Sequence, residues 1–258
     1  MALIQQGKRA EALACLRQAL FQMPKSAAGC TTLGLALAQL GQVDEAVVIF
    51  RAAVRLQPDF AQAHHNLGVA QAQQGKLADA VTSFREALRL KPDYAEAHYN
   101  LGNTLREQGQ RDQSIANYRQ ALRHKPDYGE SMCNLGLALT ETGQRGDLGE
   151  AVMLLKQATR LRPDDVTAYN NLGLALADLG RFAEAEASYE QALRIAPAHA
   201  QAHANLGSAY KEQGRLDEAA ACYKQALRLD PDSASTHWNL SLTWLQMGEY
   251  ERGWRRRR

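Results

Sequence analysis

The stretch Ala61–Tyr94, AQAHHNLGVAQAQQGKLADAVTSFREALRLKPDY, contains the pattern that decides the fold. If its residues are numbered 1 to 34, glycine stands at positions 8 and 15, alanine at 20 and 27, phenylalanine at 24 and proline at 32. The prolines of the chain repeat this spacing, with successive gaps of 34, 34, 34, 37, 34 and 34 residues; they are Pro24, Pro58, Pro92, Pro126, Pro163, Pro197 and Pro231. A fixed period of this length indicates stacked supersecondary units instead of one globular core.

Each residue type in the repeat has a structural reason. Gly75 at position 15 suits the left-handed conformation that caps a helix, and Pro92 at position 32 ends the next helix because it has no N–H donor. Small residues at positions 8, 20 and 27 let two helices approach closely, and the aromatic ring at 24 fills the space between them. The pattern predicts helix A over about positions 1–14 and helix B over about positions 17–31, with no strand. We therefore expect an all-α protein.

Six full repeats are predicted, at 27–60, 61–94, 95–128, 129–165, 166–199 and 200–233. A partial repeat precedes them at 1–26, and another with a basic tail follows at 234–258, so we expect a fragment of a longer protein. Repeat 129–165 is three residues longer than the others, and the extra residues fall within Gln144–Gly149. We expect a bulge in the turn between helices A and B, with a docking loop as the alternative.

These residues resemble the tetratricopeptide repeat, whose signature includes Leu-Gly at positions 7–8, alanine at 20, an aromatic residue at 24, alanine at 27 and proline at 32. The match covers essentially the whole chain. The resemblance implies an α-solenoid, a right-handed superhelix of antiparallel helix pairs, in which the A helices line the concave surface.

Composition narrows the classes of function. The formal net charge is +2, and it becomes −2 without Arg255–Arg258, so the body of the chain does not bind nucleic acid through bulk charge. Cys15, Cys30, Cys133 and Cys222 form no CxxC pair, which indicates free thiols in a reducing compartment. No apolar run resembles a signal peptide or reaches 18 residues, so we expect a cytoplasmic protein without membrane partners.

An asparagine occupies position 6 of six consecutive A helices; these residues are Asn66, Asn100, Asn134, Asn171, Asn205 and Asn239. At about 100° of rotation per residue, position 6 lies opposite the packed face of helix A. Asparagine is a mediocre helix former, and its amide group matches the donors and acceptors of a peptide backbone. With helices about 8–10 Å apart and an extended chain rising about 3.3 Å per residue, one amide per repeat is spaced to hold roughly every third residue of a peptide.

Two alternatives to peptide binding account for the same asparagines. They could bond to the next repeat as a structural ladder, or they could be inherited from one ancestral repeat without a separate role at each site. The sequence leaves all three interpretations open.

Residues beside the asparagine row complete the predicted peptide-binding set. Tyr99 stands at position 5, and the acids Glu107, Glu141 and Asp178 stand at position 13. The acids predict a mildly acidic groove that favours neutral or basic segments. A solvated helical face is the alternative for these charges.

One string gives a narrower resemblance. Lys91–Gly102, KPDYAEAHYNLG, resembles the N-terminal superhelix of O-linked N-acetylglucosamine transferases and their plant and bacterial relatives. That resemblance implies an asparagine ladder on the inner surface that binds the backbone of a polypeptide substrate, at the six asparagines named above. The catalytic glycosyltransferase domains of that family are absent from the sequence. We expect either the substrate-recruiting part of a protein O-glycosyltransferase or a free adaptor.

No catalytic set stands out in the sequence, which lacks GxxxxGK[ST], HExxH and GxSxG. His64, His98, His203 and His237 at position 4 are expected to be packing residues, because equivalent sites in neighbouring repeats lie too far apart for one zinc ion. We therefore expect no catalytic residue, metal or cofactor, and an interaction module that grips an extended peptide. The alternatives are a self-assembling scaffold, with homo-oligomers formed through the chain ends or convex face, and an RNA-binding array, which the near-neutral charge disfavours.

Overall fold

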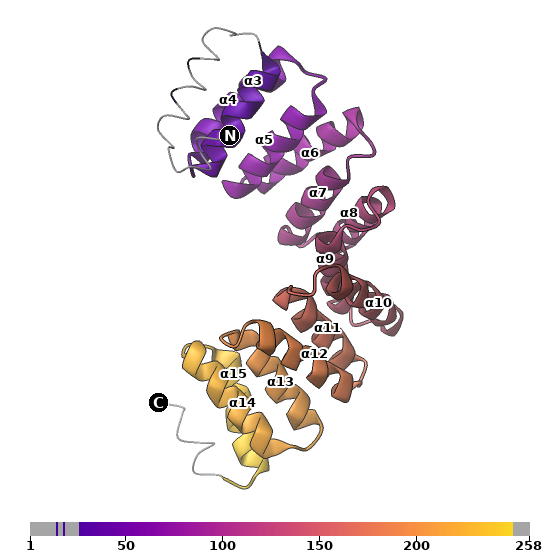
Figure 1. Cartoon of the computed structure of the whole chain (residues 1–258), viewed down its shortest axis with the longest axis vertical. Helices are drawn as coiled ribbons and strands as arrows, with labels where there is room; N and C mark the ends of the chain where they lie inside the picture. The colour runs from indigo at the N-terminus through magenta and orange to yellow at the C-terminus, as the bar shows by residue number, and fades with distance from the viewer. Residues whose placement is uncertain (1–13, 15–17, 19–25, 250–258) are drawn as a thin grey trace. The chain divides into compact units, whose positions relative to one another are not determined.

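The computed structural model describes Ala14, Gln18 and residues 26–249, and its helices follow one another in pairs along the chain (Figure 1). Most of the partial repeat predicted at 1–26 lies outside these described residues, as does the basic tail after Glu249. Contacts divide the chain into an N-terminal half, residues 1–126, and a C-terminal half, residues 127–258. Each half is a stack of helix pairs in its own right.

The described part of the chain is helical and contains no strand. The N-terminal half contains α3 (Ala27–Gln39), α4 (Val43–Leu56), α5 (Ala61–Gln73), α6 (Leu77–Leu90), α7 (Ala95–Glu107) and α8 (Arg111–His124). The C-terminal half contains α9 (Gly129–Thr140), α10 (Arg145–Leu161), α11 (Val166–Asp178), α12 (Phe182–Ile195), α13 (Ala200–Glu212), α14 (Leu216–Leu229) and α15 (Ala234–Gln246). Odd-numbered helices are the A helices and even-numbered ones the B helices. The prediction of an all-α array of helix pairs is confirmed.

The turn between helices A and B depends on glycine. Gly75 has a φ of 74°, and the turn it makes allows the Lys76 N–H to donate to the carbonyl oxygen of Gln71 at 2.9 Å. The glycine at position 15 of every described repeat has a positive φ, between 68° and 79°. A side chain with a Cβ adopts this conformation only with strain, so this position ends helix A at a fixed point.

Position-4 histidines tie helix A to the proline turn before it. The imidazole Nε2 lies 2.8–3.0 Å from the proline carbonyl oxygen six residues earlier in four repeats; the pairs are His64–Pro58, His98–Pro92, His203–Pro197 and His237–Pro231. A carbonyl oxygen only accepts, so Nε2 carries the proton and donates. These rings stabilise the turns between repeats.

The interior of each helix pair is one large side chain packed on a glycine. Position 24 holds Phe50, Phe84, Tyr118, Leu155, Tyr189 and Tyr223, each at most 1% exposed. A Cβ added to Gly68 would lie 2.8 Å from two ring carbons of Phe84, so only glycine fits at position 8. Ala80 and Ala87, at positions 20 and 27 of the same repeat, are fully buried. Burial of one such ring contributes roughly 1.5–3 kcal/mol to the stability of the fold. The small residues at positions 8, 20 and 27 leave the space that the ring fills.

The extra residues of repeat 129–165 lengthen a helix instead of a loop. Gly143 ends the A–B turn with a φ of 68°, and α10 begins two residues later. α10 has 17 residues, whereas α8 and α12 have 14. The predicted bulge is therefore wrong. Three residues make nearly one helical turn, so Leu148 stays buried, and Asp147 accepts a hydrogen bond from the Thr142 hydroxyl at 2.7 Å.

Successive repeats in each half pack through the B helix of one and the A helix of the next. In the N-terminal half α4 packs on α5 and α6 on α7; in the C-terminal half α10 packs on α11, α12 on α13 and α14 on α15. Neighbouring A helices also touch, as α3 and α5 do, and α11 and α13. Leu33, Phe50 and Leu67 belong to one buried cluster that joins three consecutive helices. Among the described helices, none is both long enough and apolar enough to span a membrane.

Candidate functional site

The position-6 asparagines of both halves are partly or largely buried side chains of the A helices. In the N-terminal half Asn66 is 8% exposed and Asn100 is half-buried. In the C-terminal half Asn171 is 5% exposed, and the other three, Asn134, Asn205 and Asn239, are half-buried. None of the six amides therefore stands fully in solvent.

Three of these amides donate a hydrogen bond to the position-5 side chain of the preceding repeat. Asn100 Nδ2 lies 2.9 Å from His65 Nε2. The other two bonds run from Asn205 Nδ2 to Asn170 Oδ1 at 3.0 Å and from Asn171 Nδ2 to Cys133 Sγ at 3.5 Å. These contacts support the structural-ladder interpretation of the row. Each of these bonds uses only one of the two N–H donors of the amide.

His65 is the node of this network in the N-terminal half. Its Nε2 accepts from Asn100, so the proton sits on Nδ1, which donates to Asn66 Oδ1 at 3.2 Å. The Tyr94 ring packs against the imidazole with 4.8 Å between ring centres. Burial lowers the pKa of His65, so the imidazole remains neutral in the folded chain.

The remaining predicted residues lie in different environments. Tyr99 is half-buried, with its ring centre 6.1 Å from that of Tyr118. Glu107 and Glu141 are exposed at the C-terminal ends of α7 and α9. Asp178, which ends α11, is exposed as well, and partial desolvation raises the pKa of its carboxyl group.

A hollow of about 350 Å³ lies between α11, α12 and α13 of the C-terminal half, and we call it the α11–α13 groove. It is lined by Leu174, Ala177, Asp178, Phe182, Tyr189, Asn205, Ser208, Ala209 and Glu212. The groove brings together two predicted residues from neighbouring repeats, Asn205 and Asp178. None of the other predicted residues lines it.

Three polar residues of this groove were not in the predicted set: Tyr189, Ser208 and Glu212. Tyr189 stands at position 24, the aromatic core position of the repeat, so the repeat pattern predicts only a packing role for it. One feature of the sequence could have indicated its second role. Position 9 of the same repeat is Leu174, which cannot form a hydrogen bond with the tyrosine hydroxyl as a polar residue would.

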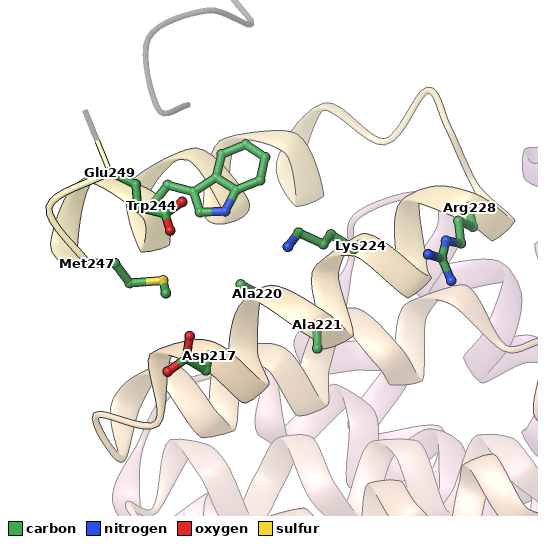
Figure 2. Close-up of a pocket in the computed structure, with 8 residues that line it drawn as sticks. All are labelled: Asp217, Ala220, Ala221, Lys224, Arg228, Trp244, Met247 and Glu249. Atoms are coloured by element: carbon green, nitrogen blue, oxygen red, sulfur yellow. The ribbon is translucent and has the colours of Figure 1, made fainter. Parts of the chain in front are cut away.

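A second hollow lies between α14 and the end of α15 (Figure 2). Trp244 and Met247 face α14 across it, and Lys224 Nζ lies 5.8 Å from the centre of the Trp244 ring. None of the predicted site residues lines this hollow.

The described residues contain neither a cluster that could bind a metal ion nor an activated thiol among Cys133 and Cys222. No three His, Cys, Asp or Glu side chains within 26–249 are placed to hold a metal ion together. Burial raises the pKa of Cys133 and of Cys222 to about 11, so both thiols are protonated at neutral pH. A protonated thiol is a poor nucleophile, so neither cysteine is activated in this structure.

Family models match most of the chain. The model described as the cilia and flagella-associated protein 70 C-terminal domain matches residues 60–252. Two models described as tetratricopeptide repeats match residues 34–75 and 1–47. The chain is a tetratricopeptide-repeat protein of this domain family. The tetratricopeptide resemblance of the sequence is confirmed, whereas the likeness to O-linked N-acetylglucosamine transferases rests on the sequence string alone.

Solved tetratricopeptide structures share the fold of this array. TTC0263, a thermophilic TPR protein of Thermus thermophilus, is 30% identical, with a TM-score of 0.57 over 72% of this chain and 99% of that one. YrrB, a TPR protein with an unusual peptide-binding site, is 21% identical, with a TM-score of 0.61 over 72% of this chain and 95% of that one. A chain of the APC/C hetero-tetramer Cut9-Hcn1 is 21% identical, with a TM-score of 0.69 over 95% of this chain and 48% of that one. No protein among the curated sequences matches this array.

Proposed function

We propose that this tetratricopeptide array binds an extended segment of a partner protein along the exposed faces of its A helices. The observation that carries the proposal is the α11–α13 groove. Its A-helix lining comes mainly from positions 6, 9 and 13 of neighbouring repeats, including Asn205 and Asp178. Helical rotation assigns positions 6 and 13 to the side of helix A opposite its packed face, whereas position 9 also reaches the position-24 side chain of its own helix B, as Asn103 and Ser208 do.

The amide of Asn205 is held in place for backbone recognition. Its Nδ2 donates to Asn170 at 3.0 Å, and its Oδ1 accepts from Gln201 Nε2 at 2.8 Å. One N–H of the amide is left for a peptide carbonyl oxygen. Because both bonds fix the side chain before a ligand arrives, little rotamer entropy is lost on binding. The ladder and peptide binding are therefore compatible at this residue.

The structural relatives agree with this class of function. YrrB is described as having a peptide-binding site, and Cut9 and Hcn1 form a protein complex. The finer form of the proposal, in which the bound segment is delivered to a glycosyltransferase, rests on the Lys91–Gly102 string. We assign no catalytic role to this chain itself.

The test is selection of binders from a displayed library of random peptides, followed by affinity measurements on variants. Asn205→Ala removes the amide from the groove and is expected to weaken selected peptides about ten-fold, which equals about 1.4 kcal/mol. Met153→Ala, at a side chain of α10 that is 65% exposed, is the control and should leave affinity unchanged. Peptides that bind N205A as tightly as the parent chain, or that depend on Met153, contradict the proposal.

A further inference from the structure

The α11–α13 groove combines a carbon-rich lining with several oxygen atoms. Leu174, Ala177, Phe182 and Ala209 supply the carbon-rich part. Carboxylate and hydroxyl oxygens come from Asp178, Tyr189, Ser208 and Glu212. Such a mixture suits a ligand group with a long apolar stem and a polar end.

The hydroxyl of Tyr189 is the unusual member of this lining. Two equivalent tyrosines have a hydrogen-bond partner at position 9 of their own repeat: Tyr118 with Asn103 at 2.7 Å and Tyr223 with Ser208 at 3.0 Å. In the repeat of Tyr189, position 9 is Leu174, which has no polar atom on its side chain. No hydrogen bond joins the Tyr189 hydroxyl to another residue in the described part of the chain.

This hydroxyl is held in place without a partner. Tyr189 is 1% exposed and lines the groove. Burial raises its pKa, and the nearby charge of Asp178 raises it further, so the hydroxyl stays protonated and can both donate and accept a hydrogen bond. Within the described residues, this oxygen is not one of the fully buried polar atoms that lack a hydrogen-bond partner, so it is open to a hydrogen-bonding group of a ligand in the groove.

The carboxylates of the groove lack strong cationic partners. Asp178 forms no ion pair within residues 26–249, and partial desolvation raises the pKa of this exposed residue at the edge of the groove. Across the same residues, Glu212 pairs with Lys211 alone, whose Nζ lies 3.8 Å from its Oε1. A cation entering the groove would offset the desolvation of Asp178, since an opposite charge within about 4–6 Å favours the ionised carboxylate.

We propose that the α11–α13 groove holds a lysine or arginine side chain of the bound segment. This inference rests on the proposed function and names the class of peptide. The methylene stem packs on Leu174 and Ala209, and the cationic group reaches the carboxylate of Asp178. The Tyr189 oxygen accepts a further N–H. A ligand carboxylate is repelled at this position, so the groove discriminates by charge.

The experiment uses the displayed-library peptides on the full chain. Each selected peptide is synthesised with its lysine replaced by norleucine, or its arginine by citrulline, which keep the stem and remove the charge. We expect a lysine or arginine in one register, and about a ten-fold loss of affinity on its replacement. Asp178→Asn should cause a similar loss, and the two changes together should cost much less than the product of the separate losses, because they remove one contact.

Matched variants separate this contact from general effects. Glu190→Gln removes an exposed carboxylate from α12 and should leave affinity unchanged. Tyr189→Phe should weaken the lysine or arginine peptide without lowering the melting temperature, since the hydroxyl has no partner to lose.

The outcomes distinguish the two proposals. If Asn205→Ala weakens binding but neutral peptides bind as well as basic ones, or D178N binds like the parent chain, the basic-residue subsite is overturned and the proposed function stands. If no selected peptide depends on Asn205, the proposed function fails and the subsite with it.

Discussion

The substitution Gly173→Ala tests the packing logic of the whole array. Gly173 stands in the middle of α11, opposite the ring of Tyr189 in α12. A Cβ at this residue would lie 2.7 Å from both Cδ1 and Cζ of the ring, and closer still to Cε1. Ordinary carbon contacts are about 3.5–4.0 Å, so the ring would have to shift by about 1 Å.

The expected loss follows from two opposing terms. Overpacking a core in this way costs typically about 1–3 kcal/mol, and the ring is 1% exposed with little room to move, which places the cost in the upper part of that range. Alanine is about 1 kcal/mol better than glycine inside a helix. We expect Gly173→Ala to lower the free energy of unfolding by about 1–2 kcal/mol.

Urea unfolding followed by far-ultraviolet circular dichroism measures this change. Repeat arrays need not unfold in one step, so transition midpoints of the variants are compared directly. Gly149→Ala is the matched control: this glycine is exposed in α10, and an added Cβ would meet nothing within 4 Å. It should stabilise the chain by about 0.5–1 kcal/mol. If G173A gains stability as G149A does, the role assigned to position 8 is wrong.

Two further predictions concern single side chains. Tyr118→Phe should lower the free energy of unfolding by about 0.5–1.5 kcal/mol, because it removes the 2.7 Å hydrogen bond to Asn103. Tyr189→Phe should leave the free energy of unfolding nearly unchanged. Equal losses for the two variants in thermal melts would contradict the conclusion that the Tyr189 hydroxyl has no hydrogen-bond partner. His65→Asn should flatten the pH dependence of stability. Because the pKa of His65 is lowered in the folded chain, the unfolded chain binds the proton more readily. The parent chain therefore loses stability as the pH falls below about 6.5 towards the folded-state pKa. Melting temperatures of H65N and the parent chain between pH 7.5 and 5 measure this difference, and parallel curves would show that His65 does not contribute.

The fold was largely predictable because the repeat fixes local geometry several times over. Gly75 sets the turn, and Phe84 against Gly68 sets the distance between the helices. The same residue types recur in other repeats, so one assignment supports the next. The extra residues at Gln144–Gly149 were misplaced because a loop and an added helical turn satisfy the same spacing. The burial of Leu148 distinguishes the added helical turn from the loop, because three extra residues make nearly one turn and keep this side chain on the buried face of the helix.

The candidate site was less predictable, because contacts between repeats depend on side chains about 35 residues apart. The sequence placed Asn100 and Asn205 on one row but gave no means of assigning their partners, His65 and Asn170. The groove around Tyr189 was missed for a related reason: a residue that fills a core and also presents a hydroxyl follows the packing pattern alone. Its role appears only when the residue facing that hydroxyl is known.

The bond between position 6 and position 5 of the preceding repeat constrains how such an array can diversify. Position 5 holds His65, Cys133 and Asn170 in three repeats, and each is the acceptor for the next asparagine. A substitution at position 5 that changes which ligand is bound therefore also changes the hydrogen bond that joins neighbouring repeats. Specificity should evolve through paired replacements across a module boundary, and the order of modules should be harder to shuffle than their similar sequences suggest.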